Sequence, residues 1–148
     1  MQRPTILDLF EQNELNISRL YRLYSQRLGE KKDFWEQISR EEIQHALDIR
    51  NSYKGKEDIF KESSFSRGTI KYVSDFVLES VEKAQKGEFT HAEALESALR
   101  IEQSFLEKKC FDIFIPNNKK VQEVLKKLNK ETEEHIKRLQ VEYKKVVK

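Results

Sequence analysis

The chain has 148 residues, of which 36% are charged and 37% hydrophobic, with only four glycines and two prolines. This length suits a single domain with a real core, and the composition is typical of long amphipathic helices rather than strands. The formal net charge of +2 is too small to indicate a nucleic-acid partner. We therefore expect the scattered lysines of the C-terminal segment to form a solvated helix face.

Cysteine content and apolar runs restrict the class of protein further. Cys110 is the only cysteine, so the chain can form neither an internal disulfide nor a paired-cysteine metal site, and a buried thiol is expected. No stretch reaches signal-peptide or membrane-spanning length. These features predict a cytoplasmic protein without a membrane partner.

Four segments repeat apolar residues every three or four positions, which predicts four long helices. They are residues 5–28, 31–53, 91–114 and 119–147. The first is expected to end at Gly29, and Thr90 with Glu93 forms a capping-box sequence. A turn is expected at 116–118.

The interval 54–90 is expected to be a crossover that contains an accessory helix at about 69–86, ended by Gly87. Two short connections and one long crossover predict two helical hairpins in one domain spanning 1–148. The expected fold is therefore an all-α four-helix bundle with one long crossover.

Each of the four main helices carries polar side chains near the middle of its apolar seam. They are Glu14, Glu42, His45, Glu102 and His135. Antiparallel packing brings mid-helix positions to one level, where three carboxylates would repel one another and take up protons unless a cation held them. Carboxylates with imidazoles suit iron, manganese or zinc.

The alternative for all five residues is a metal-free polar network that specifies packing, since a lone Glu-x-x-His sequence is a weak signal. Their coincidence at one level favours a metal site. Tyr21 and Tyr24, on the same helix as Glu14, are expected mainly to pack, although Tyr21 could hydrogen-bond a ligand.

These residues resemble the ferritin-like superfamily and, within it, the rubrerythrin-like diiron-carboxylate proteins. The matching pieces are Glu14 with Tyr21, and residues 42–46, 94–102 and 131–135. The resemblance implies a ferritin-like fold in which Glu14, Glu42 and His45 bind one metal ion, with Glu42 able to bridge. It implies that Glu102 and His135 bind a second ion.

The chain departs from the family pattern at two positions. Thr132 occupies the position of the glutamate in the family's second Glu-x-x-His sequence. Phe105 occupies the position at which rubrerythrins carry an additional carboxylate. Glu131 could substitute for the missing ligand from a different angle. Three outcomes stay open: a dimetal centre, a single-metal site on the first three ligands, or a remnant without metal.

The resemblance implies a non-haem iron oxidoreductase that acts on peroxide or oxygen, or that oxidises Fe(II). Its cofactor would be one or two iron ions, with manganese or zinc as other options. The rubredoxin-like module of rubrerythrins is excluded by the single cysteine, so a separate electron-donor protein is expected, and a homodimer is common among similar proteins. The alternative is a helical binding or structural module.

Overall fold

A computed structural model describes residues 6–53, 64–87, 89–107 and 119–147. These residues form five α-helices, one short 3-10 helix and no strand, so the predicted all-α class is confirmed. The helices are α1 (Ile6–Arg27), η1 (Gly29–Lys31), α2 (Lys32–Tyr53), α3 (Ser64–Lys86), α4 (His91–Glu107) and α5 (Lys119–Val146). In this described part of the chain, no helix combines the length and the apolarity needed to cross a membrane.

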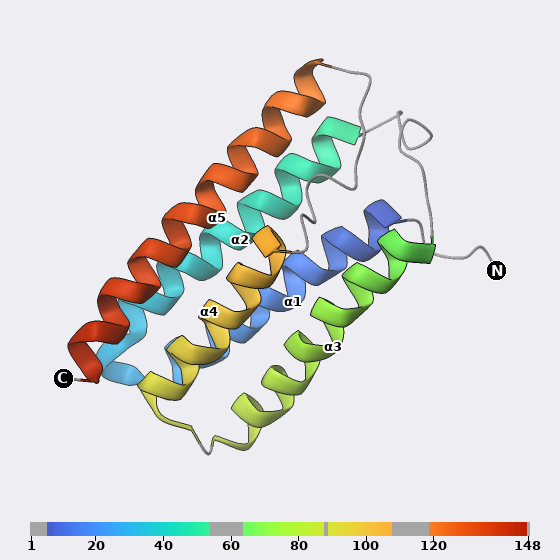
Figure 1. The fold of residues 1–148 in the computed structure, drawn as a ribbon. Helices are drawn as coiled ribbons and strands as arrows, with labels where there is room; N and C mark the ends of the chain where they lie inside the picture. Colours follow the sequence, from blue (N-terminus) through green and yellow to red (C-terminus); the bar gives the residue numbers. More distant parts are fainter. Residues whose placement is uncertain (1–5, 54–63, 88, 108–118, 148) are drawn as a thin grey trace.

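The helices pack side by side as a bundle (Figure 1). α1 and α2 form an antiparallel pair joined through η1, α4 packs against α5, and α5 also contacts α2. α3 packs along α1 in the same direction as α1 and also contacts α4. It brings the chain back to the end of the bundle where α2 starts, and α4 begins there. A long crossover between the second and third main helices requires this geometry.

The bounds of α1, α2 and α5 agree with the predicted segments to within one residue, and α4 begins at His91 as expected. The remainder of the third predicted helix, 108–114, lies outside the described residues, as do Cys110 and the turn at 116–118. α3 differs from the prediction, because it starts at Ser64, five residues before position 69. Ser64, Ser66 and Gly68 are weak helix formers, so the sequence carries no signal for this first turn, and the contacts of α3 with α1 stabilise the helix as a whole.

Local signals at the start of α4 are confirmed. Gly87, just after α3, has a φ of +75°, which glycine adopts without strain. The Glu93 amide donates to Thr90 Oγ1 at 3.1 Å, and the Thr90 amide donates to Glu93 Oε1 at 3.0 Å. α1 ends at Arg27, and Gly29 begins η1.

An aromatic cluster closes the end of the bundle where α2 and α4 begin. The Tyr24 and Trp35 ring centroids are 4.8 Å apart, and those of Tyr21 and Trp35 are 5.5 Å apart. Phe89 packs on Tyr24, and Phe34 packs edge-on against Trp35. Because these rings bury a large apolar area, they keep water away from one end of the polar residues described next.

Candidate metal centre

All five polar residues predicted at mid-helix meet in the centre of the bundle, and none is more than 2% exposed. They form two groups: Glu14, Glu42 and His45, and then Glu42, Glu102 and His135. Within each group, one ligand atom from every residue lies within 4.8 Å of the others. Ligands on opposite sides of an ion bound at about 2.1 Å would be about 4.2 Å apart. Each group could therefore hold an ion after small side-chain movements.

Glu42 belongs to both groups, and its two carboxylate oxygens face different histidines. Oε2 lies 3.6 Å from His45 Nδ1, and Oε1 lies 3.2 Å from His135 Nδ1. Oε1 is buried and makes no hydrogen bond of good geometry with any described residue. The two imidazole rings stack at 5.3 Å with an angle of 19° between their planes. A carboxylate placed in this way is suited to bridge two ions.

Each histidine turns its other nitrogen toward a carboxylate at the edge of the bundle. His135 Nε2 lies 2.8 Å from Glu41 Oε1, and His45 Nε2 lies 2.7 Å from Glu131 Oε2. A carboxylate at this position orients the ring and leaves Nδ1 available to a metal ion. The contacts are reciprocal, because Glu41 precedes His45 by four residues on α2 and Glu131 precedes His135 by four on α5.

The α5 contribution to the two groups is His135 alone. Thr132 is buried, but its hydroxyl donates to the Leu128 carbonyl of its own helix at 2.9 Å. Glu131, expected as a substitute ligand, contacts the far nitrogen of His45 and belongs to neither group. The structure therefore places Glu131 where it orients a candidate ligand. The side chain of Phe105 lies outside the described residues.

The two tyrosines of α1 differ in role. Tyr21 is fully buried and its hydroxyl donates to Glu102 Oε1 at 3.1 Å, so it does hydrogen-bond a candidate ligand. Burial, together with the nearby Glu102 and Glu42 carboxylates, raises the pKa of Tyr21 well above its ordinary value and keeps it a donor. Tyr24 packs against Tyr21 and Trp35, as expected.

The buried carboxylates behave as a crowded set. Burial and repulsion from Glu42 raise the pKa of Glu102 to about 7. Burial also disfavours charge on Glu42, but its contacts with Glu14 and the two histidines outweigh this and hold the Glu42 pKa well below its usual range. Crowding of the carboxylates was predicted to make them take up protons, and Glu102 does so near neutral pH.

His135 balances part of this negative charge. Burial opposes its protonation, but the contacts with Glu102, Glu41 and Glu42 raise its pKa to about 12. Glu41 is held in turn by His135 and Arg138, which lower its pKa to about 2 despite partial burial. In the absence of a metal ion, the His135 imidazolium therefore stands where a cation is required.

Glu41 was not predicted from the sequence. The available signal was a repetition, since Glu41 precedes Glu42 and His45 as Glu131 precedes Thr132 and His135. That alignment pairs the first glutamates of the two helices. It does not show which histidine each would contact, because that depends on how α2 and α5 cross.

Comparison of the chain with protein-family models, with curated proteins and with solved structures found no match. The described residues thus define a helical protein, bundle-like in its packing, with buried Glu/His groups that could hold metal ions. The rubrerythrin-like resemblance rests on the residues themselves.

Proposed function

We propose that this chain is a rubrerythrin-like member of the ferritin-like superfamily and acts as a non-haem iron oxidoreductase. The observation that carries the proposal is the placement of Glu42, whose two oxygens face the Nδ1 atoms of two different histidines inside a buried carboxylate cluster. A protein rarely buries so many ionisable groups together unless they bind something.

In this proposal Glu14, Glu42 and His45 hold one ion, and Glu42, Glu102 and His135 hold a second. Iron bound there would supply redox chemistry toward peroxide or oxygen, or would convert Fe(II) to Fe(III). The protein positions these ligands and excludes bulk water from them. Manganese and zinc suit the same donor set.

The first group is expected to fill first. Its three ligands come from α1 and α2, which are joined by the three-residue helix η1. The second group also needs α4 and α5, and α5 offers Thr132 where a bridging carboxylate is expected. The missing bridge would be a solvent molecule or an exogenous anion.

Reducing equivalents would come from a separate electron-donor protein, because one cysteine cannot supply an iron–cysteine module. The cytoplasm and a homodimer are the proposed setting and assembly.

The test is to produce the protein in iron-supplemented medium and to measure its metal content by elemental analysis together with its visible spectrum. One to two iron ions per chain are expected, with loss of metal in Glu42→Ala and His45→Ala. Glu134→Ala, an exposed change on α5, is the control and should keep its metal. Iron-loaded protein should consume peroxide in the presence of an electron donor. Metal-free wild-type protein of undiminished stability would reject the proposal.

A second function is favoured by one specific observation. His135 contacts Glu41, Glu42 and Glu102 within 3.4 Å, so the buried charges are partly balanced without an ion. This suits a helical binding or structural module whose polar residues only specify packing. Such a module predicts a melting temperature that is unaffected by chelators and by added Fe(II) or Zn(II).

A further inference from the structure

The two edge carboxylates that contact the histidines are held differently. Glu41 interacts with Arg138 and with His135, and it accepts a hydrogen bond from Gln37 at 2.8 Å. Glu131, besides its contact with His45, forms an ion pair with Lys127 at 3.8 Å in the described part of the chain. The charge of Glu41 is therefore neutralised by the Arg138 guanidinium, whereas Glu131 has only the distant Lys127 ammonium as a described cationic partner at the surface.

Glu131 also connects the buried histidine to the surface. Its Oε2 lies 2.7 Å from His45 Nε2, and its Oε1 faces Lys127. The His45 side chain is 3% exposed, and its Nε2 has no well-aligned hydrogen-bond partner among the described residues. Because this contact is poorly aligned, the Glu131 carboxylate can turn toward an arriving cation without breaking a strong hydrogen bond.

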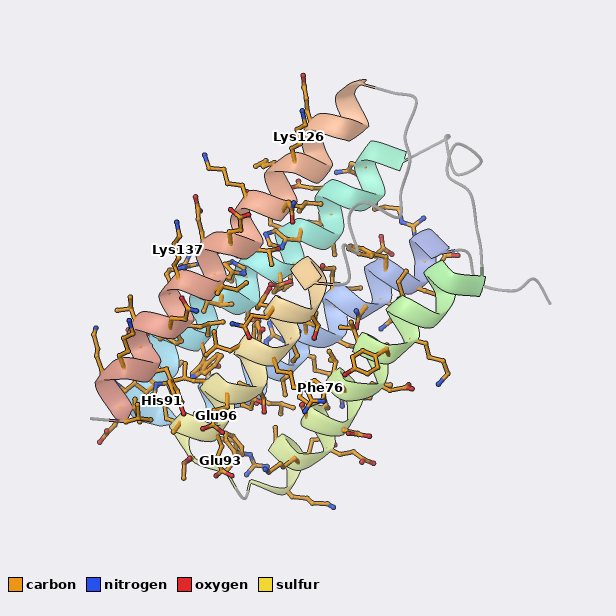
Figure 2. All side chains as sticks on the ribbon, viewed as in Figure 1. Phe76, His91, Glu93, Glu96, Lys126 and Lys137 are labelled. Carbon is orange, nitrogen blue, oxygen red and sulfur yellow. The ribbon has the colours of Figure 1, made fainter. Side chains whose placement is uncertain are left out.

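The Lys127 ammonium lies between two carboxylates, 3.8 Å from Glu131 and 4.0 Å from Asp48. Asp48 accepts a hydrogen bond from Gln44 at 2.9 Å, which positions it on α2. The Lys127 side chain is 63% exposed, and the neighbouring Lys126 extends outward from α5 in Figure 2. An exposed lysine at such distances is weakly held and can leave.

We propose that Glu131 is the residue through which a divalent cation reaches the buried centre, with Lys127 as the cation that it displaces. This inference rests on the proposed function. The arriving ion replaces the ammonium between Asp48 and Glu131, and these two carboxylates then supply its first protein ligands. The opposite edge cannot serve, since Arg138 already neutralises Glu41.

The experiment measures uptake of Co(II) by the full-length metal-free protein. Stopped-flow absorbance gives the association rate, and equilibrium titration gives the stoichiometry and the Kd. Glu131→Gln should slow association by about tenfold or more, since a charge at an access point concentrates cations locally. The Kd should change less than about threefold, because the glutamine carbonyl can still orient His45 through its Nε2–H.

Matched controls lie on the same helix. Glu134→Gln removes the same charge from an exposed position and should leave the rate within about twofold of wild type, because exposed charges act weakly in salt. Lys127→Met should accelerate uptake more than Lys130→Met does.

Three results would overturn the inference. The first is equal rates for Glu131→Gln and Glu134→Gln. The second is a fall in affinity that matches the fall in rate, which would make Glu131 only a positioning residue. The third is slower uptake by Lys127→Met. Absence of stoichiometric Co(II) binding by wild-type protein would instead reject the proposed function and the inference together.

Discussion

Metal binding should stabilise the folded protein, and Glu42→Gln should abolish most of that stabilisation. Glutamine keeps the shape of the Glu42 side chain but removes the charge that both groups of ligands share. Because the two oxygens of Glu42 face different histidines, this single change weakens both candidate ion positions at once. No other residue of the centre belongs to both groups among the described residues.

The size of the effect follows from linkage. An ion that binds only the folded state at a free concentration of one hundred times its Kd adds about 2.7 kcal/mol to the free energy of unfolding. For a chain near 150 residues, each kcal/mol raises the melting temperature by about 2–4 °C. Wild-type protein should therefore melt about 5–11 °C higher with saturating metal than with chelator.

Differential scanning calorimetry of chelated and metal-saturated samples measures this shift. Glu42→Gln should show less than half of it, and exposed Glu134→Gln should show all of it. An unchanged wild-type melting temperature, or an equal shift in Glu42→Gln, would refute the reasoning.

Three further outcomes are expected. Glu41→Gln should lower the free energy of unfolding of the metal-free protein by about 1–2 kcal/mol in urea titrations, because it weakens the charged hydrogen bonds that the partly exposed Glu41 makes with His135 and Arg138. Thr132→Glu should destabilise the metal-free protein and raise the metal content toward two ions per chain, measured by elemental analysis. Stability of the metal-free protein should fall as pH rises from about 5 to 9. The folded-state pKa values of Glu102 and His135, about 7 and about 12, lie above their unfolded values, so the folded state holds both protons to higher pH. Urea titrations at several pH values check this trend, and a rise in stability over that range would contradict it.

The sequence could predict which residues meet at the centre, because helical periodicity directly sets which side chains share the buried face. Glu14, Glu102 and His135 are buried for that reason, and each stands in a row of apolar residues at three- and four-residue spacing. The same periodicity located α1, α2 and α5 to within one residue. Single-helix patterns were sufficient for both results.

Contacts between helices needed the structure. Glu41 and Glu131 lie at the edges of their helices, and only the crossing of α2 and α5 pairs each with the histidine of the other helix. The start of α3 was missed for a different reason, because Ser64, Ser66 and Gly68 have low intrinsic helix preference and give no local signal of a helix. Side-chain charge and helix propensity are local properties, whereas these pairings are set by tertiary geometry.

Charge balance connects the metal-free fold to metal binding. Near neutral pH the second group holds protons on His135, whose pKa its carboxylate contacts raise to about 12 against the effect of burial. It also holds a proton in part on Glu102, whose pKa burial and the Glu42 charge raise to about 7. Ligands must release their protons before they bind a metal ion. One divalent ion that replaces two such protons leaves the buried charge unchanged, so the bundle can fold first and exchange protons for metal afterwards. Metal affinity should therefore rise with pH over the range in which the stability of the metal-free protein falls. A polar network that only specifies packing predicts no such link between metal affinity and stability.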